Sequence, residues 1–139
     1  MIALGVLGAL ALLVVAPGVG GPAQAAPATR EGDSQMARMV VIYKMPKDVK
    51  TFERHYFEKH VPLAKKLPGL RKYEVSHGPI TSPAGPTDAW MIATLCFDDL
   101  AAIRNAFATE IGQACAADRR ELAPDPSMFQ MILFDDKEV

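Results

Sequence analysis

The chain has 139 residues and a formal net charge of −1, from 15 basic and 16 acidic side chains. The two signs are interspersed from residue 30 onward, so the sequence provides no basic surface for nucleic acid or an anionic membrane, and neither partner is predicted. The two cysteines and three histidines lack the spacing of a zinc site, so no metal is predicted. No G-x-G-x-x-G or P-loop motif occurs, so no cofactor is predicted.

The first 29 residues differ from the rest because none of them carries a charge. Their apolar run, residues 4–16, is shorter than the roughly 20 residues that span a bilayer, so no stable membrane span is expected. The run leads to Ala23-Gln24-Ala25, a small-x-small pattern that is typical of a signal-peptidase site. We therefore expect a signal peptide over residues 1–25 and an exported or periplasmic protein.

A second interpretation of the amino-terminal segment stays open. The start codon can lie too far upstream, in which case the protein begins at Met36 or Met39 and is cytoplasmic. Where residues 1–25 are a signal peptide, residues 26–37 are a linker. Under both interpretations residues 38–139 suffice for one domain with a single core.

The first predicted elements of the domain are a strand and an amphipathic helix. A continuous apolar run predicts a strand over residues 36–44. Asp48 is placed to cap the helix that follows, and Pro68-Gly69 ends it. Pro62 lacks an N–H, which predicts a kink or restart of the helix near His60. One face of the helix forms an apolar stripe that also contains a histidine. The residues of this stripe recur at three- and four-residue steps: Val49, Phe52, Tyr56, His60, Leu63 and Leu67.

Three more strands and a second helix are predicted in the remainder of the domain. The strands cover residues 70–77, 89–97 and 128–134, and a loop rich in Pro and Gly joins the first two. The helix is expected to weaken or restart after Gly112. Its stripe consists of Leu100, Ile103, Phe107, Ile111 and Cys115.

The order βαββαβ predicts an α+β, ferredoxin-like fold, with a four-stranded antiparallel sheet and two helices on one face. Most strands are apolar on both alternating faces. In the strand over residues 89–97, one face carries Trp90, Ile92 and Cys96 and the other Met91, Leu95 and Phe97. Two helices cover only one face of a sheet, so the other requires a cover that this chain does not supply. We therefore expect a homodimer formed by packing sheet against sheet.

Five short motifs link the chain to a known family: Val41-Ile42-Tyr43, Phe52 with Tyr56, His60-Val61-Pro62-Leu63, Leu67-Pro68-Gly69-Leu70 and Phe97-Asp98-Asp99-Leu100. In these motifs, from about Met39 to Phe134, the chain resembles the EthD family of the dimeric α/β-barrel superfamily. The resemblance implies a barrel of two subunits, with a pocket between each sheet and its helices. Family members are associated with ethyl tert-butyl ether degradation beside a monooxygenase and are often labelled reductases. Relatives isomerise methyl-substituted muconolactones.

Three residues are candidates for catalysis. His60 is an ionisable group on an apolar stripe, and its ordinary pKa of about 6.5 suits a general acid or base. Its alternative role is a histidine bonded to a carbonyl at a helix break. Tyr43 can orient a ligand through its hydroxyl or only pack, and Cys96 is either a reactive thiol or an inert buried one. His55 lies about 140° around a continuous helix from His60, so the two are not expected to share a metal.

The function predicted from these observations is the binding of a small apolar or aromatic metabolite. The protein then acts as an isomerase, a proton-transfer catalyst or an oxidoreductase-associated protein that uses His60. The alternative is a non-catalytic binding or accessory protein that serves a partner oxygenase. Haem handling, known among distant relatives of the superfamily, is a third possibility that visible absorbance would test.

Overall fold

A computed structural model describes residues 35–139. The predicted signal peptide and most of the predicted linker lie outside these residues. Within them the elements are β1 (Ala37–Lys44), α1 (Val49–His55), the π-helical turn η1 (Tyr56–His60), α2 (Val61–Ala64), β2 (Lys72–Val75), β3 (Ala89–Phe97), α3 (Leu100–Ala108), α4 (Glu110–Leu122), the 3₁₀ turn η2 (Pro126–Met128) and β4 (Phe129–Asp135). The strands form one antiparallel sheet in the order β2-β3-β1-β4. The predicted ferredoxin-like architecture is confirmed.

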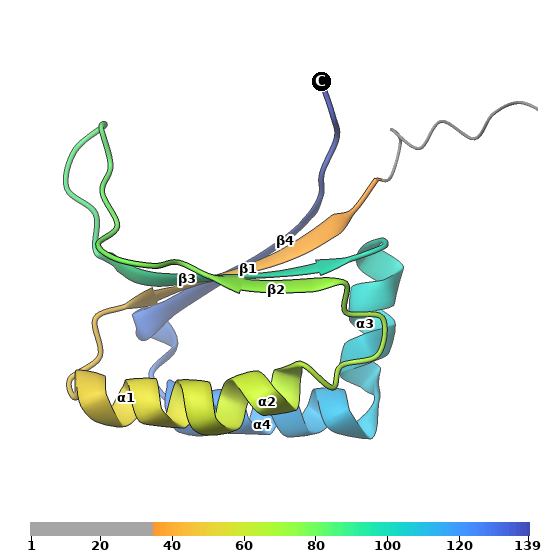
Figure 1. The fold of residues 1–139 in the computed structure, drawn as a ribbon, viewed down its shortest axis with the longest axis horizontal. Coiled ribbons are helices and arrows are strands. Elements are labelled where there is room, and N and C mark those ends of the chain that lie inside the picture. The colour runs from red at the N-terminus through yellow and green to blue at the C-terminus, as the bar shows by residue number, and fades with distance from the viewer. Residues whose placement is uncertain (1–34) are drawn as a thin grey trace, which may run out of the picture. The chain divides into compact units, whose positions relative to one another are not determined.

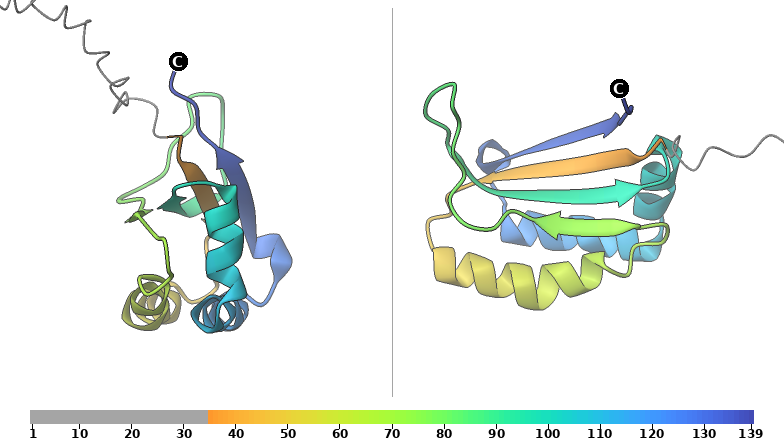
Figure 2. Two further views of the ribbon diagram at one scale, coloured as in Figure 1. Left: turned by 90° about the vertical axis from the view of Figure 1, so that its right-hand side faces the viewer. Right: turned by 45° about the horizontal axis from the view of Figure 1, so that its top comes forward.

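All helices lie on one side of this sheet. Figure 1 shows the sheet above and the helices below, with α1, α2 and α4 running along it. Seen from the end in Figure 2, the α1–α2 segment and α4 lie side by side, and α3 rises from α4 towards the sheet. Among residues 35–139 no helix lies on the other side, although the loop between β2 and β3 rises on that side. We call the two sides the helix face and the open face.

Alternation along the strands places different side chains on the two faces. In β1, Met39 and Val41 lie on the helix face and are each 5% exposed, whereas Val40 and Ile42 lie on the open face and are half-buried. Strand β4 forms one edge, and its Ile132 pairs with Val40 on the open face with 38% of its surface exposed. The centre of the open face is thus apolar, as the strand patterns predicted, and no helix of residues 35–139 covers it, whereas Lys72 and Glu74 of β2 make its other edge charged.

The first helical segment changes its hydrogen bonding where proline requires it. Asp48 caps α1, and its side chain accepts from the backbone N–H of Thr51 at 3.0 Å. In η1 the backbone N–H of Val61 donates to the carbonyl of Tyr56, five residues back, and Pro62 then occupies the first turn of α2, where no N–H is needed. The predicted restart near His60 takes the form of a π-turn, through which the backbone keeps helical angles.

The second helical segment breaks earlier than predicted. Helix α3 ends at Ala108 and α4 begins at Glu110, so the restart lies at Thr109 and not after Gly112. Thr109 is extended, and its hydroxyl accepts from the Gly112 N–H at 3.1 Å while donating to the Ala106 carbonyl. A Cβ on Gly112 would lie 2.3 Å from that carbonyl oxygen, so the corner between the helices requires glycine.

The predicted strands agree with the structure to within a residue, except one. Strand β3 has the predicted bounds, β1 and β4 each begin one residue later than predicted, and β2 is shorter than the predicted residues 70–77. None of the helices formed by residues 35–139 combines the length and apolar character of a membrane span.

Candidate functional site

A carboxylate on α4 connects the two histidines of the first helical segment. Asp118 Oδ2 lies 2.8 Å from His60 Nδ1, and Asp118 Oδ1 lies 2.8 Å from His55 Nε2. Asp118 is 4% exposed and His60 is 8% exposed, so this contact lies at the packed interface between the two helical segments. A buried charge is stable only with such partners.

The π-turn explains how both histidines reach one carboxylate. On a continuous α-helix, His55 and His60 would point about 140° apart, which was the prediction. In a π-turn the hydrogen bond joins residues five apart, so residues at this spacing lie above one another on one helix face. The prediction that the two histidines do not share a metal assumed a continuous α-helix, and the π-turn between them removes that assumption, because both histidines contact one carboxylate.

The protonation state of this group follows from its hydrogen bonds. Burial alone would raise the pKa of Asp118, but hydrogen bonds from Lys59, His55 and His60 outweigh it and hold the pKa at about 2. A carboxylate only accepts, so Nδ1 of His60 must carry a proton and donate it. Burial lowers the pKa of His60 below 6.5, and Asp118 opposes this only in part. At neutral pH His60 is therefore uncharged, with the lone pair on Nε2.

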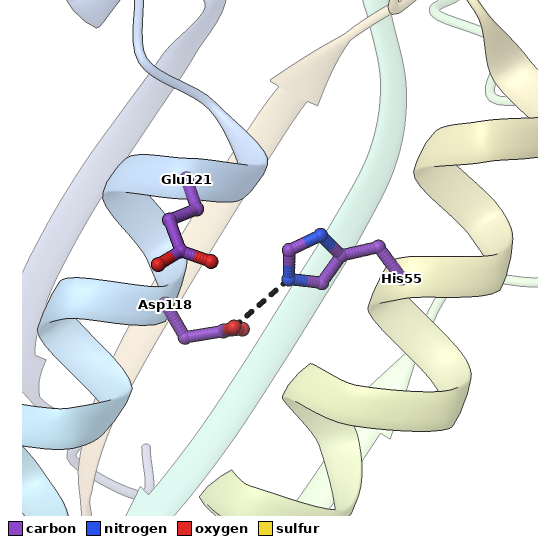
Figure 3. Close-up of side chains that lie close together, drawn as sticks. All are labelled: His55, Asp118 and Glu121. Carbon is purple, nitrogen blue, oxygen red and sulfur yellow. Dashed lines mark hydrogen bonds and ion pairs between the residues drawn. The ribbon is translucent and has the colours of Figure 1, made fainter.

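A surface cation completes the group around Asp118. Lys59 Nζ lies 2.9 Å from both Asp118 Oδ1 and Glu121 Oε2. His55, Asp118 and Glu121 each bring one potential ligand atom within 4.8 Å of the others, and Figure 3 shows them converging from α1 and α4. These are suitable donors for a divalent metal, but the Lys59 ammonium already lies between the two carboxylates. A metal ion could bind there only if Lys59 moved away.

The other side of His60 faces a cavity of about 350 Å³ between the helices and β4. We call it the His60 cavity. Its lining is mostly apolar and includes Met39, Leu67, Leu95, Ile103, Phe107 and Leu133. Nε2 of His60 has no hydrogen-bond partner. Among residues 35–139 every fully buried polar side-chain atom has such a partner, so Nε2 is not fully buried. Nε2 is therefore accessible, and the cavity that His60 lines is where a ligand can reach it.

Tyr43 lies apart from this cavity. It is 2% exposed on the helix face, with its ring edge-on to Phe52 and Tyr56. It lines a second cavity of about 330 Å³ with His55, between α1 and the end of α4. Burial raises the pKa of its phenol, which therefore stays protonated near neutrality. Tyr43 is thus separated from His60 by the Tyr56 ring, which packs against both.

Cys96 does not join His60 either. It pairs with Arg38 across β1 and β3 on the open face, where the Arg38 guanidinium lies 3.6 Å from its sulfur. The cysteine that lines the His60 cavity is Cys115, and burial raises the pKa of its thiol. Trp90 was predicted to share a face with Cys96. Instead it packs edge-on against Phe52 on the helix side, because a bulge interrupts the register of β1 and β3 beside it.

Sequence analysis missed Asp118, although a signal for it was present. Ile111, Cys115, Asp118 and Leu122 recur at steps of four, three and four residues, so a carboxylate lies on an apolar helical stripe. The same reasoning singled out His60 in the first helix. Two ionisable groups on the facing stripes of two packed helices predict a buried pair.

Comparison with known proteins was made in sequence and in structure. A family model described as the EthD domain matches residues 44–126. An uncharacterized 11.0 kDa protein of the thcB-thcC intergenic region of Rhodococcus erythropolis is 36% identical over 104 residues, which cover 74% of this chain and 96% of that protein.

Solved structures with the same fold come from several kinds of protein. An ethyl tert-butyl ether D (EthD) family protein from Bacillus halodurans has a TM-score of 0.65 at 27% identity, covering 73% of this chain and 99% of its own. A hydroxynitrile lyase from Passiflora edulis has a TM-score of 0.60 at 14% identity, covering 76% and 97%. SnoaB from Streptomyces nogalater, described as a cofactor-independent oxygenase, has a TM-score of 0.55 at 17% identity, covering 76% and 96%.

Proposed function

The chain belongs to the EthD family, and we propose that it binds a small apolar or aromatic molecule in the His60 cavity, where His60 transfers a proton. One observation carries this proposal. The Nδ1–H of His60 is held by the Asp118 carboxylate at 2.8 Å, while the opposite nitrogen has no protein partner and His60 lines an apolar cavity. Cavities of about 300–1,000 Å³ with few polar groups are typical of small-molecule sites, and this one falls in that range.

The arrangement suits a general base that later returns its proton. Nε2 of His60 takes a proton from a C–H or O–H group of the bound molecule, and the imidazolium that forms is stabilised by Asp118. The same nitrogen then donates the proton to another atom of the bound molecule, which completes an isomerisation. Alternatively, it donates the proton to a leaving group. Asp118 is a positioning residue, because it contacts His60 and not the ligand.

Two fold neighbours are described as enzymes, so this fold supports catalysis in other proteins. One is described as a hydroxynitrile lyase and the other as a cofactor-independent oxygenase. The second description names an enzyme that works without a cofactor, and we propose the same here. The alternative, a binding protein that serves a partner oxygenase, uses the same cavity but leaves the ligand unchanged.

The test begins with native mass spectrometry of the full chain purified from its own host, which identifies a retained small molecule. That compound is then incubated with the protein in D₂O, and NMR follows deuterium incorporation at carbon. We expect exchange with the wild type and none above background with His60→Gln. Binding without exchange by the wild type would establish the accessory alternative. Equal exchange by both proteins would overturn the role of His60.

Asp118→Asn tests the positioning role separately. Removing the carboxylate removes an interaction that raises the pKa of His60, so the pH midpoint of exchange should move to lower pH and the maximal rate should fall. A residue with only a structural role would lower the amount of folded protein and leave the midpoint in place.

We also propose that two copies pack their open faces together. The open face is apolar, and two fold neighbours are described as dimeric proteins with a ferredoxin-like fold. Burying Val40, Ile42 and Ile132 against a second copy would remove from water the apolar surface that no helix covers. Sedimentation velocity of the purified chain at micromolar concentration would give a dimer, and a stable monomer would overturn this part of the proposal.

A further inference from the structure

The charged groups of the His60 cavity all have one sign. Besides His60, its polar lining consists of Arg104 from α3 and Arg119 from α4, and no Asp or Glu side chain lines it. The cavity that His55 lines differs, because Lys44 and Lys47 are accompanied there by Asp48, Glu121 and Asp125. Of these two cavities, only the His60 cavity therefore has an uncompensated positive charge.

Neither arginine of the cavity uses its charge elsewhere in the described part of the chain. Arg38 and Arg71 are paired with Asp136 and Asp98. Across residues 35–139, neither Arg104 nor Arg119 forms an ion pair or a side-chain hydrogen bond. The guanidinium carbon of Arg119 lies 4.4 Å from the centre of the Phe129 ring, and this stacking fixes the plane of the group. Stacking on a ring leaves the in-plane N–H groups of a guanidinium free to donate hydrogen bonds.

We propose that the ligand of the His60 cavity carries a carboxylate, which Arg104 and Arg119 bind, on an apolar body that extends towards His60. This inference rests on the proposed function of the same cavity and specifies its substrate class. Guanidinium groups bind carboxylates through paired, charge-assisted hydrogen bonds, which are stronger than neutral ones. Leu67, Leu95 and Ile103 then surround the apolar body.

The position of the arginines also couples binding to the chemistry. Arg119 follows Asp118 directly on α4. Asp118 accepts the hydrogen bond from His60, and Arg119 lines the same cavity as His60. Burial is the main reason for the low pKa of His60, and the positive charge of Arg119 lowers it further. A carboxylate bound to Arg119 offsets that charge. Binding of the anion should therefore make His60 a stronger base when the substrate is present.

Two probes of the same shape and different charge test the inference. We would measure the affinity of the full chain for 2-naphthoate and for the uncharged 2-naphthamide by isothermal titration calorimetry at low salt. The wild type should bind the carboxylate at least about tenfold more tightly, since a hydrogen-bonded charge pair is typically stronger than a neutral one by that factor. Added salt should weaken binding of the carboxylate more than binding of the amide.

Substitutions assign the preference to the cavity. Arg104→Gln and Arg119→Gln should each reduce the preference for the carboxylate about tenfold, and Arg119→Lys should keep part of it. Arg120→Gln is the matched control, because this neighbour on α4 is exposed and does not line the cavity. It should leave both affinities unchanged. Circular dichroism melting of each variant verifies that it is folded.

The possible results separate this inference from the proposed function. If both probes bind equally and neither arginine variant changes their affinities, the carboxylate inference is wrong while an apolar ligand remains supported. If neither probe binds, both the inference and the use of the cavity fail. His60→Gln should retain the preference for naphthoate although it abolishes proton transfer. Loss of the preference in His60→Gln would show that His60, and not the arginine pair, recognises the anion.

Discussion

The two faces of the sheet are built from similar side chains and differ in what covers them. On β1, Met39 and Val41 are buried under the helices, while Val40 and Ile42 point to the open face and remain half-buried. The helix face also contains a buried polar group around Asp118. At the β4 edge the cover is incomplete on both faces, because Leu133 on the helix face is 43% exposed and Ile132 on the open face is 38% exposed. Strand composition alone does not separate the faces, because their difference arises from the second layer.

Variants on the two faces should therefore fail in different ways. A change under the helices alters the free energy of unfolding of each subunit. In the proposed dimer, a change on the open face should alter association and leave the subunit folded. Four predictions test this contrast, ordered from the largest expected effect to the smallest.

Asp118→Ala should cause the largest loss on the helix side. The substitution removes the partner of His55, His60 and Lys59 at once, so we expect the free energy of unfolding to fall by about 3 kcal/mol. Urea denaturation measures this change. Glu121→Ala is the control, because this exposed side chain bonds only to Lys59 and should change stability by less than about 0.5 kcal/mol. Equal effects of the two variants would contradict a central role for Asp118.

Gly112→Ala should destabilise the corner between α3 and α4. The added Cβ would lie 2.3 Å from the backbone oxygen of Ala106, which a flexible side chain cannot relieve. We expect a loss of about 2 kcal/mol in urea denaturation, from overpacking against the backbone. Ala114→Ser, at an exposed position on the same helix, should stay within about 0.5 kcal/mol of the wild type. A neutral Gly112→Ala would mean that the corner opens at little cost.

Ile132→Lys should act on association. The side chain lies on the open face, 38% exposed, and a buried lysine without a partner would weaken sheet-to-sheet packing. We expect the dimer to dissociate at least about tenfold more readily in sedimentation equilibrium, with an unchanged circular dichroism spectrum. Met45→Lys, on an apolar side chain that is 63% exposed outside the sheet, is the matched control. Similar dissociation of both variants would locate the interface elsewhere.

The helix face should also make stability depend on pH. The folded pKa of His60 lies below 6.5, so the unfolded chain binds more protons and stability falls as pH drops below that value. The pKa of Asp118 is lowered from 3.8 to about 2, so its contribution is present above about pH 4 and is lost as pH falls through 2. Urea midpoints across pH should show both decreases. His60→Gln should remove the first and Asp118→Asn the second, and unchanged profiles would contradict these assignments.

The sequence allowed much of the fold to be predicted. Strand β3 was predicted with its observed bounds, because its apolar residues lie between a loop rich in Pro and Gly and an acidic turn. Pro62 predicted a break near His60, since the lack of an N–H is a local property. The apolar character of both strand faces is likewise visible in the residues themselves.

Details that depend on contacts between distant segments were not predicted. The restart of the second helix lies at Thr109 because the Gly112 backbone packs against α3, and no local pattern reveals that approach. Trp90 and Cys96 were predicted to share one face of their strand, and a bulge in the pairing of β1 with β3 sends the two side chains to opposite faces. The register of two strands decides this, and register is not local.

The amino-acid sequence by itself determined the order of elements, the doubly apolar sheet and the unusual position of His60, because each follows from neighbouring residues and helical or strand periodicity. Only the tertiary structure decided what His60 contacts. The π-turn brings His55 and His60 to one side, the packing of α4 places Asp118 against both, and the cavity beside them gathers Arg104 and Arg119. His55 and Asp118 lie 63 positions apart in the chain, and packing of the two helical segments brings them together.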